Sequence, residues 1–301
     1  MKTEHDVIII GGSYAGLSAA MSLGRSLRKV LVIDSGQPCN AYTPHSHNFL
    51  TQDGNTPSAI SALGRSQVER YKTVTFLDDL AIRVSGKDNA FEIEVQSGEQ
   101  FGAKKIILAT GIKDIFQDIP GLKACWGKSV VHCPYCHGYE YHRMKTAILA
   151  SGENAIHYAV LVSNLTKDLT ILTNGATNLS LEQASKIRAK GIQIIETPVR
   201  EIIHTDGAVS SVAFQDAKTL PVDVVYFRPE FTHHTDIPVK LGCEFTDQGY
   251  LKIDSMQKTT VNGVFACGDN SSMMRSVANA VATGNFAGAV VNREVATANF
   301  W

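Results

Sequence analysis

The sequence carries no excess of charge and no long apolar run. Its 28 lysines and arginines are balanced by 29 aspartates and glutamates, so the formal net charge is −1. Binding to nucleic acid or to an anionic membrane through a broad basic field requires a cationic excess, so we expect neither partner. Glu4 and Asp6 precede a short apolar segment, whereas signal peptides and membrane spans need longer apolar runs. We therefore expect a cytoplasmic protein.

Cysteine is scarce and mostly isolated. Four of the six cysteines stand alone, and such residues are most often small buried hydrophobes: Cys39, Cys125, Cys243 and Cys267. The stretch HCPYCHGYE places Cys133 and Cys136 two residues apart, as in half of a zinc site, a local disulfide or a redox-active dithiol. No second C-x-x-C pair completes a zinc site, and a disulfide across so short a loop adds little stability. A dithiol that turns over is favoured, and we expect no metal.

The first forty residues form a dinucleotide-binding pattern. The apolar run Asp6–Ile10 predicts a buried strand, GGSYAG (residues 11–16) a tight turn, and the following small residues a helix. A second apolar run, Val30–Ile33, ends on Asp34. A glycine-rich turn before a helix offers free N–H groups to a pyrophosphate, and an acid about twenty residues later binds a ribose hydroxyl. Ser13 replaces the middle glycine of the usual motif.

Later segments indicate more strands and a second nucleotide-binding unit. Short strands are expected between residues 73 and 107, and the last leads into Thr110-Gly111. VNGVFACGDN (residues 261–270) predicts another apolar strand, followed by a helix. In mid-chain, KTAILASGENAIHYAVLVSNL predicts strand, turn and helix, with LTILTNG as the next strand. At 301 residues the chain is long enough for two domains.

Together these motifs resemble the low-molecular-weight thioredoxin reductase family of two-domain flavin disulfide oxidoreductases. GGSYAG resembles its FAD pyrophosphate turn, ATG (residues 109–111) its mid-chain flavin motif, CPYC its dithiol, and GVFACGDNSSMMRSVANAVATG its C-terminal FAD motif. The resemblance implies an α/β fold with two Rossmann-like three-layer nucleotide-binding domains, the second inserted in the first. It implies an FAD-binding domain of residues 1–113 and 231–301, an inserted NAD(P)H-like domain of residues 114–230 that carries the dithiol, and a homodimer.

The resemblance also implies a set of FAD-binding residues. Asp269 is expected at the ribityl or pyrophosphate group, Arg275 to Val277 at the flavin edge, and Trp301 stacked on the flavin. Ser276 stands where the family usually has glutamine. The full predicted set is Gly11, Gly12, Ser13, Tyr14, Ala15, Gly16, Asp34, Ser35, Gln37, Asn40, His47, Ala81, Thr110, Gly111, Gly268, Asp269, Arg275, Ser276, Val277 and Trp301.

Three residues are the predicted catalytic groups. The family pattern makes Cys136 the flavin-facing sulfur and Cys133 the interchange sulfur. His137 stands where many relatives have an acid, and imidazole can move a thiol proton near neutral pH. The segment CxxCHGYE also resembles the dithiol oxidases of gliotoxin and holomycin biosynthesis, which pass electrons through FAD to oxygen.

The second nucleotide unit departs from the family pattern. Its turn reads ASGENA (residues 150–155), so the first glycine is lost and Glu153 lies where phosphates would sit. The basic cluster expected for the 2′-phosphate of NADPH is replaced by LTNGATN (Leu172–Asn178), and His157 replaces a usual glutamate. Either NAD(P)H binds poorly or in another way, or it no longer binds. Electrons would then come from ferredoxin, a reduced flavin carrier or a thiol substrate.

The sequence thus predicts an FAD-dependent dithiol/disulfide oxidoreductase with uncertain NAD(P)H use. Its partner is expected to be a thioredoxin-like protein or a small dithiol. Two alternatives stay open: a small-molecule dithiol oxidase that uses oxygen, and a non-catalytic FAD-containing protein that senses redox state.

Overall fold

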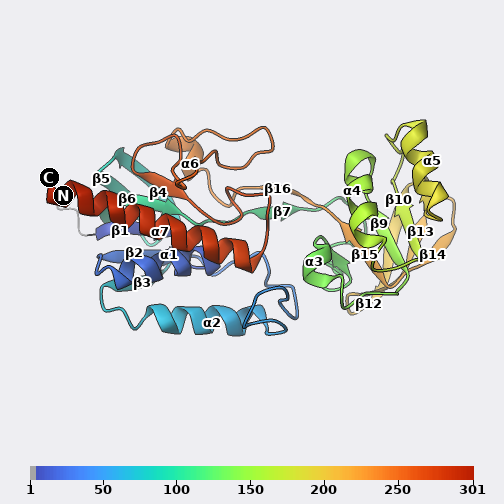
Figure 1. The fold of residues 1–301 in the computed structure, drawn as a ribbon, viewed down its shortest axis with the longest axis horizontal. Coiled ribbons are helices and arrows are strands. Elements are labelled where there is room, and N and C mark those ends of the chain that lie inside the picture. The colour runs from blue at the N-terminus through green and yellow to red at the C-terminus, as the bar shows by residue number, and fades with distance from the viewer. Residues whose placement is uncertain (1–4) are drawn as a thin grey trace. The chain divides into compact units, whose positions relative to one another are not determined.

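The computed structural model describes residues 5–301; Glu4 and the other residues that open the predicted FAD-binding domain lie outside the described residues. The chain divides into two units (Figure 1). The first holds the chain up to Ala41 with residues 57–113 and 231–301, and the second holds residues 42–56 and 114–230. The chain passes between them at strands β7 (Lys113–Ile115) and β16 (Glu230–Thr232), which pair with each other.

The first unit is built on one mixed sheet. The strands run in the order β3-β2-β1-β6-β5-β4, and β17 pairs with β6. Pairing is parallel from β3 to β6 and to β17, and antiparallel from β6 to β4. The elements are β1 (His5–Ile10), α1 (Tyr14–Arg25), β2 (Val30–Asp34), α2 (Pro57–Val68), β3 (Val74–Asp78), β4 (Ala81–Lys87), β5 (Ala90–Val95), β6 (Gln100–Leu108), α6 (Ile237–Lys240), β17 (Val264–Ala266) and α7 (Val277–Phe300).

Small residues let the helices of this unit pack closely. α7 runs alongside α1 (Figure 1), and a Cβ added at Gly284 of α7 would lie 2.1 Å from the carbonyl oxygen of Ala15. Likewise, a Cβ at Gly16 would lie 1.8 Å from the carbonyl oxygen of Gly11. The small residues seen in the sequence therefore bring α1 against both the first turn and the C-terminal helix.

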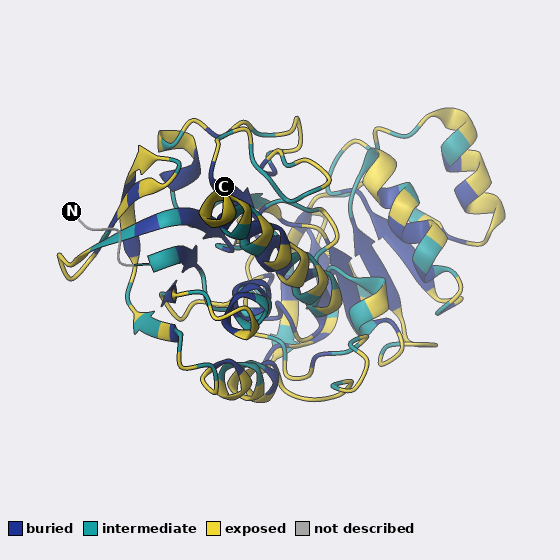
Figure 2. Cartoon of the chain, turned by 60° about the vertical axis from the view of Figure 1, so that its left-hand side comes forward, coloured by how far each residue is buried: buried dark blue, intermediate teal, exposed yellow. Residues whose placement is uncertain are grey.

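The second unit combines a parallel sheet with a small antiparallel one. The parallel sheet has the order β11-β10-β9-β15-β8, and β12, β13 and β14 form the other. Figure 2 shows that strands of this unit are buried while helix faces reach solvent. The elements are β8 (Val130–Val131), α3 (Pro134–His137), β9 (Thr146–Leu149), α4 (Gly152–Val162), β10 (Leu169–Leu172), α5 (Leu181–Ala189), β11 (Gln193–Ile195), β12 (Val199–Thr205), β13 (Ala208–Phe214), β14 (Thr219–Pro221) and β15 (Val224–Phe227).

The predicted α/β fold with two Rossmann-like units is confirmed. One difference concerns residues 42–56, which the predicted boundaries assign to the FAD-binding domain but which group with residues 114–230. The reason is close packing: a Cβ added at Gly127 would lie 3.0 Å from the carbonyl carbon of Tyr42. Across residues 5–301, every helix is too short or too polar to cross a bilayer.

Candidate functional site

The two cysteines of the CPYC segment form a disulfide with each other. Cys133 follows β8 and caps α3, and Pro134 occupies the first helical position, where its fixed φ and missing N–H are tolerated. The backbone N–H of Cys136 donates to the sulfur of Cys133 over 3.1 Å. A donor aimed at that sulfur favours its thiolate form once the bond is reduced.

The residues around the disulfide hold α3 in place. A Cβ at Gly138 would lie 2.3 Å from the carbonyl oxygen of Pro134 and 2.5 Å from Leu165, so glycine permits close packing after the short helix. The hydroxyl of Tyr158 donates to the carbonyl oxygen of His132 over 2.8 Å. The ring of His132 stacks on Trp126 with centroids 5.6 Å apart. Close packing and these contacts therefore fix the segment that carries the two cysteines.

His137 directly follows Cys136 in the chain and has a lowered pKa. Burial, together with the charge of His47, lowers the pKa of His137 from 6.5 to about 4. Desolvation and a nearby like charge both disfavour the protonated imidazole. At neutral pH the ring of His137, which directly follows Cys136 in the chain, is therefore unprotonated.

In the first unit the predicted FAD motifs converge from distant parts of the chain. The buried side chain of Asn270, in the C-terminal motif, donates to the carbonyl oxygen of Leu108 over 2.8 Å and to the hydroxyl of Thr110 over 3.2 Å. A Cβ at Gly268 would lie 3.0 Å from the Cβ of Ala15 in the glycine-rich turn. The C-terminal motif thus joins the mid-chain motif and the start of α1.

Other predicted residues complete the same group. A Cβ at Gly12 would lie 2.8 Å from the Cβ of Asp34, which places this acid against the glycine-rich turn. Asp269 lies 3.8 Å from Arg275 and accepts a weak contact from the thiol of Cys39 at 3.7 Å. Ser276 caps α7, where its hydroxyl accepts the backbone N–H of Asn279 over 3.1 Å.

The chemistry of this region fits FAD. Within residues 5–301, the buried Oδ1 atom of Asn270 accepts no hydrogen bond, so it can receive a hydroxyl of a ligand. Around Gly111, which has φ +61°, the space beyond the missing Cβ is open. α1 begins at the glycine-rich turn with an N-terminus suited to a pyrophosphate. Gly11 to Gly16, Asp34, Thr110 and Asp269 would hold the dinucleotide.

Other predicted residues differ in exposure and in the unit that contains them. Ser35 and Gln37 are exposed after β2, and Ala81 is buried in the apolar core of the first unit. His47 lies in the second unit. Trp301 is 94% exposed at the end of α7, and a 24-residue helix of about 1.5 Å per residue puts it about 36 Å from Val277. Trp301 and Val277 therefore do not line one site in a single chain.

The second glycine-containing turn is closed by the chain's own backbone. The hydroxyl of Ser151 donates to the carbonyl oxygens of Thr177 at 2.6 Å and Ala176 at 3.2 Å. The N–H of Gly152 donates to the carbonyl oxygen of Thr177 over 3.0 Å. These donors lie at the N-terminus of α4, where a Rossmann fold binds phosphate.

The loop that closes this turn is held firmly, and the first turn of α4 is acidic. The hydroxyl of Thr173 donates to the carbonyl oxygen of Gly175 over 2.6 Å, and the N–H of Gly175 donates to the carbonyl oxygen of Glu196 over 3.0 Å. Glu153 accepts a 2.9 Å hydrogen bond from Gln183. The residues of this turn do not fit the pyrophosphate of NAD(P)H, because acceptors and a carboxylate occupy its place.

The carbonyl groups of Ala176 and Thr177 were not predicted, because backbone acceptors leave no side-chain signal in the sequence. The asparagine- and glycine-rich composition of LTNGATN was the available hint. Asn174, Gly175 and Asn178 all adopt positive φ, which folds this loop back. Glu140, which lies 3.5 Å from His47, was also missed as a site residue although it belongs to the quoted CxxCHGYE segment.

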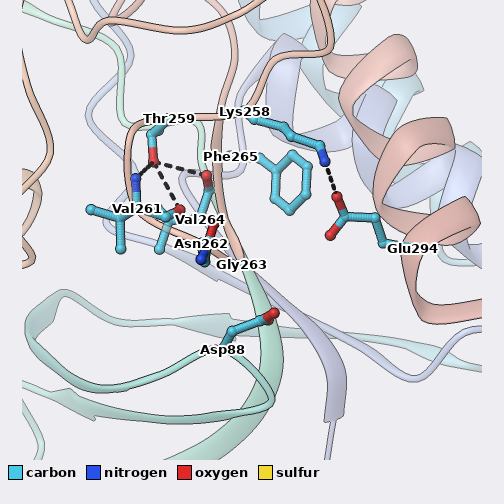
Figure 3. Close-up of a pocket in the computed structure, with 9 residues that line it drawn as sticks. All are labelled: Asp88, Lys258, Thr259, Val261, Asn262, Gly263, Val264, Phe265 and Glu294. Carbon is cyan, nitrogen blue, oxygen red and sulfur yellow. Dashed lines mark hydrogen bonds and ion pairs between the residues drawn. The ribbon is translucent and has the colours of Figure 1, made fainter. Parts of the chain in front are cut away.

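A polar pocket in the first unit has a structural role (Figure 3). Its lining residues include Asp88, Lys258 and Glu294, and Lys258 forms an ion pair with Glu294. The 5% exposed Lys105 contacts Asp88 at 2.6 Å and Glu294 at 3.2 Å. This paired network ties α7 to the sheet, and its walls contain none of the predicted FAD or dithiol residues.

Known proteins resemble this chain over nearly its full length. Residues 5–284 match the family model described as pyridine nucleotide-disulphide oxidoreductase. Thioredoxin reductase tcpT from Claviceps purpurea is 34% identical, with 96% of this chain and 94% of that protein covered. An oxidoreductase from Agrobacterium tumefaciens is 38% identical with a TM-score of 0.92, covering 97% and 99% of the two chains. The crystal structure of HlmI is 29% identical with a TM-score of 0.93, covering 100% and 95%.

The matches span nearly the full length of each protein and include both units. The chain therefore belongs to the pyridine nucleotide-disulphide oxidoreductase family and is a thioredoxin reductase-like, FAD-dependent disulfide oxidoreductase.

Proposed function

We propose that this protein oxidises a dithiol substrate and passes the electrons through FAD to oxygen without using NADPH or NADH. The substrate is a thioredoxin-like protein or a small dithiol. The observation that carries the proposal is the closed turn of α4, where Thr177 accepts hydrogen bonds from Ser151 and Gly152. This closed turn supports a reaction without a nicotinamide donor, in which the thiol substrate is itself the source of electrons.

The Cys133–Cys136 disulfide is the group that accepts these electrons. A substrate thiolate attacks Cys133, the bond to Cys136 breaks, and a mixed disulfide forms. The second substrate thiol displaces Cys133, which releases an oxidised substrate and leaves a reduced enzyme dithiol. Neutral His137 moves protons at Cys136 during this exchange. The exposed rings of Tyr135 and Tyr139 beside the disulfide offer apolar surface to a substrate.

Bound FAD supplies a two-electron acceptor that re-forms the disulfide and that oxygen can reoxidise, with hydrogen peroxide as product. The chain's part is to hold the dinucleotide with the glycine-rich turn, Asp34, Thr110 and Asp269. These residues are gathered in one unit by the contacts of Asn270 and Gly268.

The test is anaerobic absorbance spectroscopy of the purified yellow protein. We expect no bleaching of the visible flavin band with NADPH or NADH, and bleaching with a dithiol such as dithiothreitol. Admitting air should restore the band and produce one hydrogen peroxide for each dithiol oxidised. Rapid bleaching by NADPH would contradict the proposal and favour a thioredoxin reductase.

Two controls separate the remaining alternatives. Cys133→Ser should abolish bleaching by the dithiol, whereas Cys243→Ala, a change at a buried cysteine remote in sequence, should leave it intact. Bleaching by dithionite but not by any dithiol would contradict the oxidase reading and favour reduced ferredoxin or a flavin carrier as the donor. A redox-sensing protein without turnover would show no difference between the two variants.

We also propose that the protein works as a homodimer in the cytoplasm. Cys125, Cys243 and Cys267 are buried thiols outside any disulfide, as is usual in a reducing compartment. Phe300 and Trp301 are exposed and pack edge to face, so they offer apolar surface to a second copy. Sedimentation of the wild type should give a dimer, and deletion of both aromatic residues should weaken it. A monomer at micromolar concentration would contradict this assignment.

A further inference from the structure

Helix α4 contacts both ends of the segment that carries the redox cysteines. The hydroxyl of Tyr158, in the second half of α4, donates over 2.8 Å to the carbonyl oxygen of His132, which directly precedes Cys133. Leu165, just after α4, packs against Gly138, because a Cβ added there would lie 2.5 Å from its side chain. α4 and the residues that follow it therefore hold this segment at both ends.

The ring of Tyr158 is fixed in the apolar core of the second unit. Tyr158 is 3% exposed and belongs to the same buried cluster as Val131 and Tyr226. Its ring centroid lies 5.8 Å from that of Tyr226, a residue of β15 that pairs with Val131 at the end of β8. A buried phenol hydroxyl needs a polar partner, and here the partner is the first carbonyl after β8, that of His132.

The start of α4 is held by the chain itself. The hydroxyl of Ser151 and the N–H of Gly152 both donate to the carbonyl oxygen of Thr177. In a Rossmann unit that binds a nucleotide, phosphate accepts from this end of the helix. Because the acceptor is covalently attached here, the position of α4 does not depend on a bound nucleotide. The helix is therefore suited to support other groups of the unit.

We propose that Tyr158 is a positioning residue of the dithiol: its hydroxyl holds the peptide group between His132 and Cys133, so that the sulfur of Cys133 stays at the N–H of Cys136. This inference rests on the turnover of Cys133 and Cys136 proposed above. It gives α4 a part in thiol exchange, within a unit whose nucleotide turn is closed.

The backbone carries this effect. The peptide group of His132 and Cys133 is planar, so a hydrogen bond to its carbonyl oxygen also fixes the N and Cα atoms of Cys133. Cys133 caps α3 with φ −114° and ψ 110°, and its sulfur lies 3.1 Å from the backbone nitrogen of Cys136. After reduction this N–H stabilises the Cys133 thiolate. Without the bond from Tyr158, the sulfur and its donor would separate more often.

The step that responds is the release of Cys133 from the mixed disulfide. The second substrate thiolate attacks the substrate sulfur bound to Cys133, the substrate disulfide forms, and the bond to Cys133 breaks. Cys133 leaves with the electron pair as a thiolate, and a thiol of lower pKa leaves faster. The substrate is thereby oxidised by two electrons, and the disulfide of Cys133 and Cys136 is reduced by two. Tyr158 acts on the rate through this leaving group.

The first measurement is the ionisation of Cys133 in reduced holoenzyme. Wild type and Tyr158→Phe are labelled anaerobically with iodoacetamide from about pH 5 to about pH 9, and fragment mass spectrometry separates Cys133 from Cys136. Tyr158→Phe keeps the buried ring and removes only the hydroxyl. We expect the labelling midpoint of Cys133 to move up by about half a pH unit or more, because its thiolate loses stabilisation.

The second measurement is the half-reaction between oxidised holoenzyme and dithiothreitol, followed at the flavin band by anaerobic stopped flow. Flavin reduction in Tyr158→Phe should be about 3-fold or more slower than in the wild type at neutral pH. FAD content and the position of the band should stay unchanged, since Tyr158 belongs to the second unit and the FAD motifs to the first.

Tyr141→Phe is the matched control. Tyr141 lies in the same unit, and its hydroxyl also donates to a backbone carbonyl oxygen, that of Lys128. Lys128 is not adjacent to either cysteine in the chain. This variant loses the same kind of hydrogen bond, but it should keep the wild-type labelling profile of Cys133 and the wild-type half-reaction.

Ser151→Ala keeps the proposal testable if Tyr158→Phe does not fold. It removes the hydroxyl that donates to Ala176 and Thr177 and leaves Tyr158 in place. α4 should then be held less firmly, so the labelling midpoint of Cys133 should move in the same direction by a smaller amount. An unshifted midpoint would in that case overturn the inference.

The inference is also overturned if Cys133 in Tyr158→Phe follows the wild-type labelling profile, or if Tyr141→Phe shifts that profile equally. A slower half-reaction with an unshifted profile would mean a structural role alone. Failure of the proposed function would look different. If NADPH bleached the flavin of the wild type, the electron donor would be reassigned, while the labelling of Cys133 in the variants would still decide the role of Tyr158.

Discussion

The hydroxyl of Ser151 donates a 2.6 Å hydrogen bond to the carbonyl oxygen of Thr177, at the place where a Rossmann turn offers its donors to a phosphate. In the first unit the equivalent turn, Gly11 to Gly16, is packed against strands and its own helix and keeps its N-terminus for a ligand. Two related turns of one chain therefore differ: the first leaves its helix N-terminus open to a ligand, and the second does not. The turn of the first unit therefore suits a dinucleotide, whereas the turn of the unit that carries the dithiol is closed by its own backbone.

The closed turn predicts that nicotinamide nucleotides do not stabilise the protein. A ligand that binds the folded state alone raises the free energy of unfolding, by about 2.7 kcal/mol at 100 times its Kd. FAD added to the stripped protein should therefore raise Tm, whereas NADPH and NADH at millimolar concentration should leave it unchanged. A reproducible rise in Tm with either nucleotide would show that the loop at Thr177 opens.

Cysteine reactivity should be confined to the redox pair and, to a lesser degree, Cys39. Burial raises the pKa of Cys125, Cys243 and Cys267, so their thiolates are rare in the native protein. After mild reduction, iodoacetamide followed by mass spectrometry should find Cys133 and Cys136 modified and these three thiols intact. In urea all cysteines should react, and equal labelling of Cys267 in the native state would refute the burial argument.

His137 should make stability depend on pH. Its pKa is lowered from 6.5 to about 4 in the folded protein, by burial first and by His47 second. As pH falls below about 6.5 the unfolded chain takes up a proton that the folded chain refuses until about pH 4. The free energy of unfolding should therefore fall through this window, by at most about 3 kcal/mol, and level off below it.

Urea midpoints measured from about pH 7 to about pH 4 test this window, with His137→Gln as the comparison because other groups also titrate there. The variant should lose less stability than the wild type as the pH falls. Parallel curves for the two proteins would mean that His137 is not shielded from protonation in the folded state.

Gly284→Ala should destabilise the first unit. The new Cβ would lie 2.1 Å from the backbone oxygen of Ala15, so α7 would have to move away from α1. Overpacking of this kind costs about 1–3 kcal/mol. Gly64→Ala in α2 is the control, since its Cβ would meet only the flexible end of Leu17 at 3.2 Å and alanine favours helix. Equal Tm values for the two variants would contradict the packing described here.

The buried Lys105 network should depend on Glu294. Burial pushes the pKa of Glu294 up, but hydrogen bonds from Lys258 and Lys105 outweigh it and hold that pKa below its usual range. Glu294→Gln should cost about 1–3 kcal/mol in urea unfolding, because the charge of the buried Lys105 loses a partner. Glu244→Gln removes an exposed pair with Lys252 and should change stability by less than about 1 kcal/mol. A similar loss in both variants would contradict a structural role for the network.

Much of the fold was readable from local pattern. The apolar runs at residues 6–10 and 30–33 became β1 and β2, and the strands expected between residues 73 and 107 became β3, β5 and β6. Some of these segments are continuous buried apolar runs, and in others apolar and polar residues alternate regularly. Both patterns give a strong signal for a strand. The helix α2, the strand β4 and the sheet β12-β13-β14 were not anticipated, because their exposed faces dilute that signal.

The site was predictable where function lies in side chains at fixed spacing. Cys133 and Cys136, whose pairing the structure shows, and Asp34 and Asp269, which stay predicted, were identified in this way. The assignment of residues 42–56 to the second unit was not, since it rests on packing against Gly127 and on the contact between His47 and Glu140, which are distant in sequence. The distance between Trp301 and Val277 could not be predicted either, because it depends on the full length of α7.

The loop of residues 174–178 supplies the acceptors for the donors at the N-terminus of α4. Because it is covalently attached, its carbonyl groups are present at the N-terminus of α4 at an effective concentration that no free nucleotide matches. Reinstating the lost glycine with Ala150→Gly and adding basic residues would supply attraction for NADPH, yet would leave the acceptors of Ala176 and Thr177 in place. Under the proposed function, conversion to nicotinamide use would require rebuilding the connection from β10 to α5 as well as restoring the consensus motif.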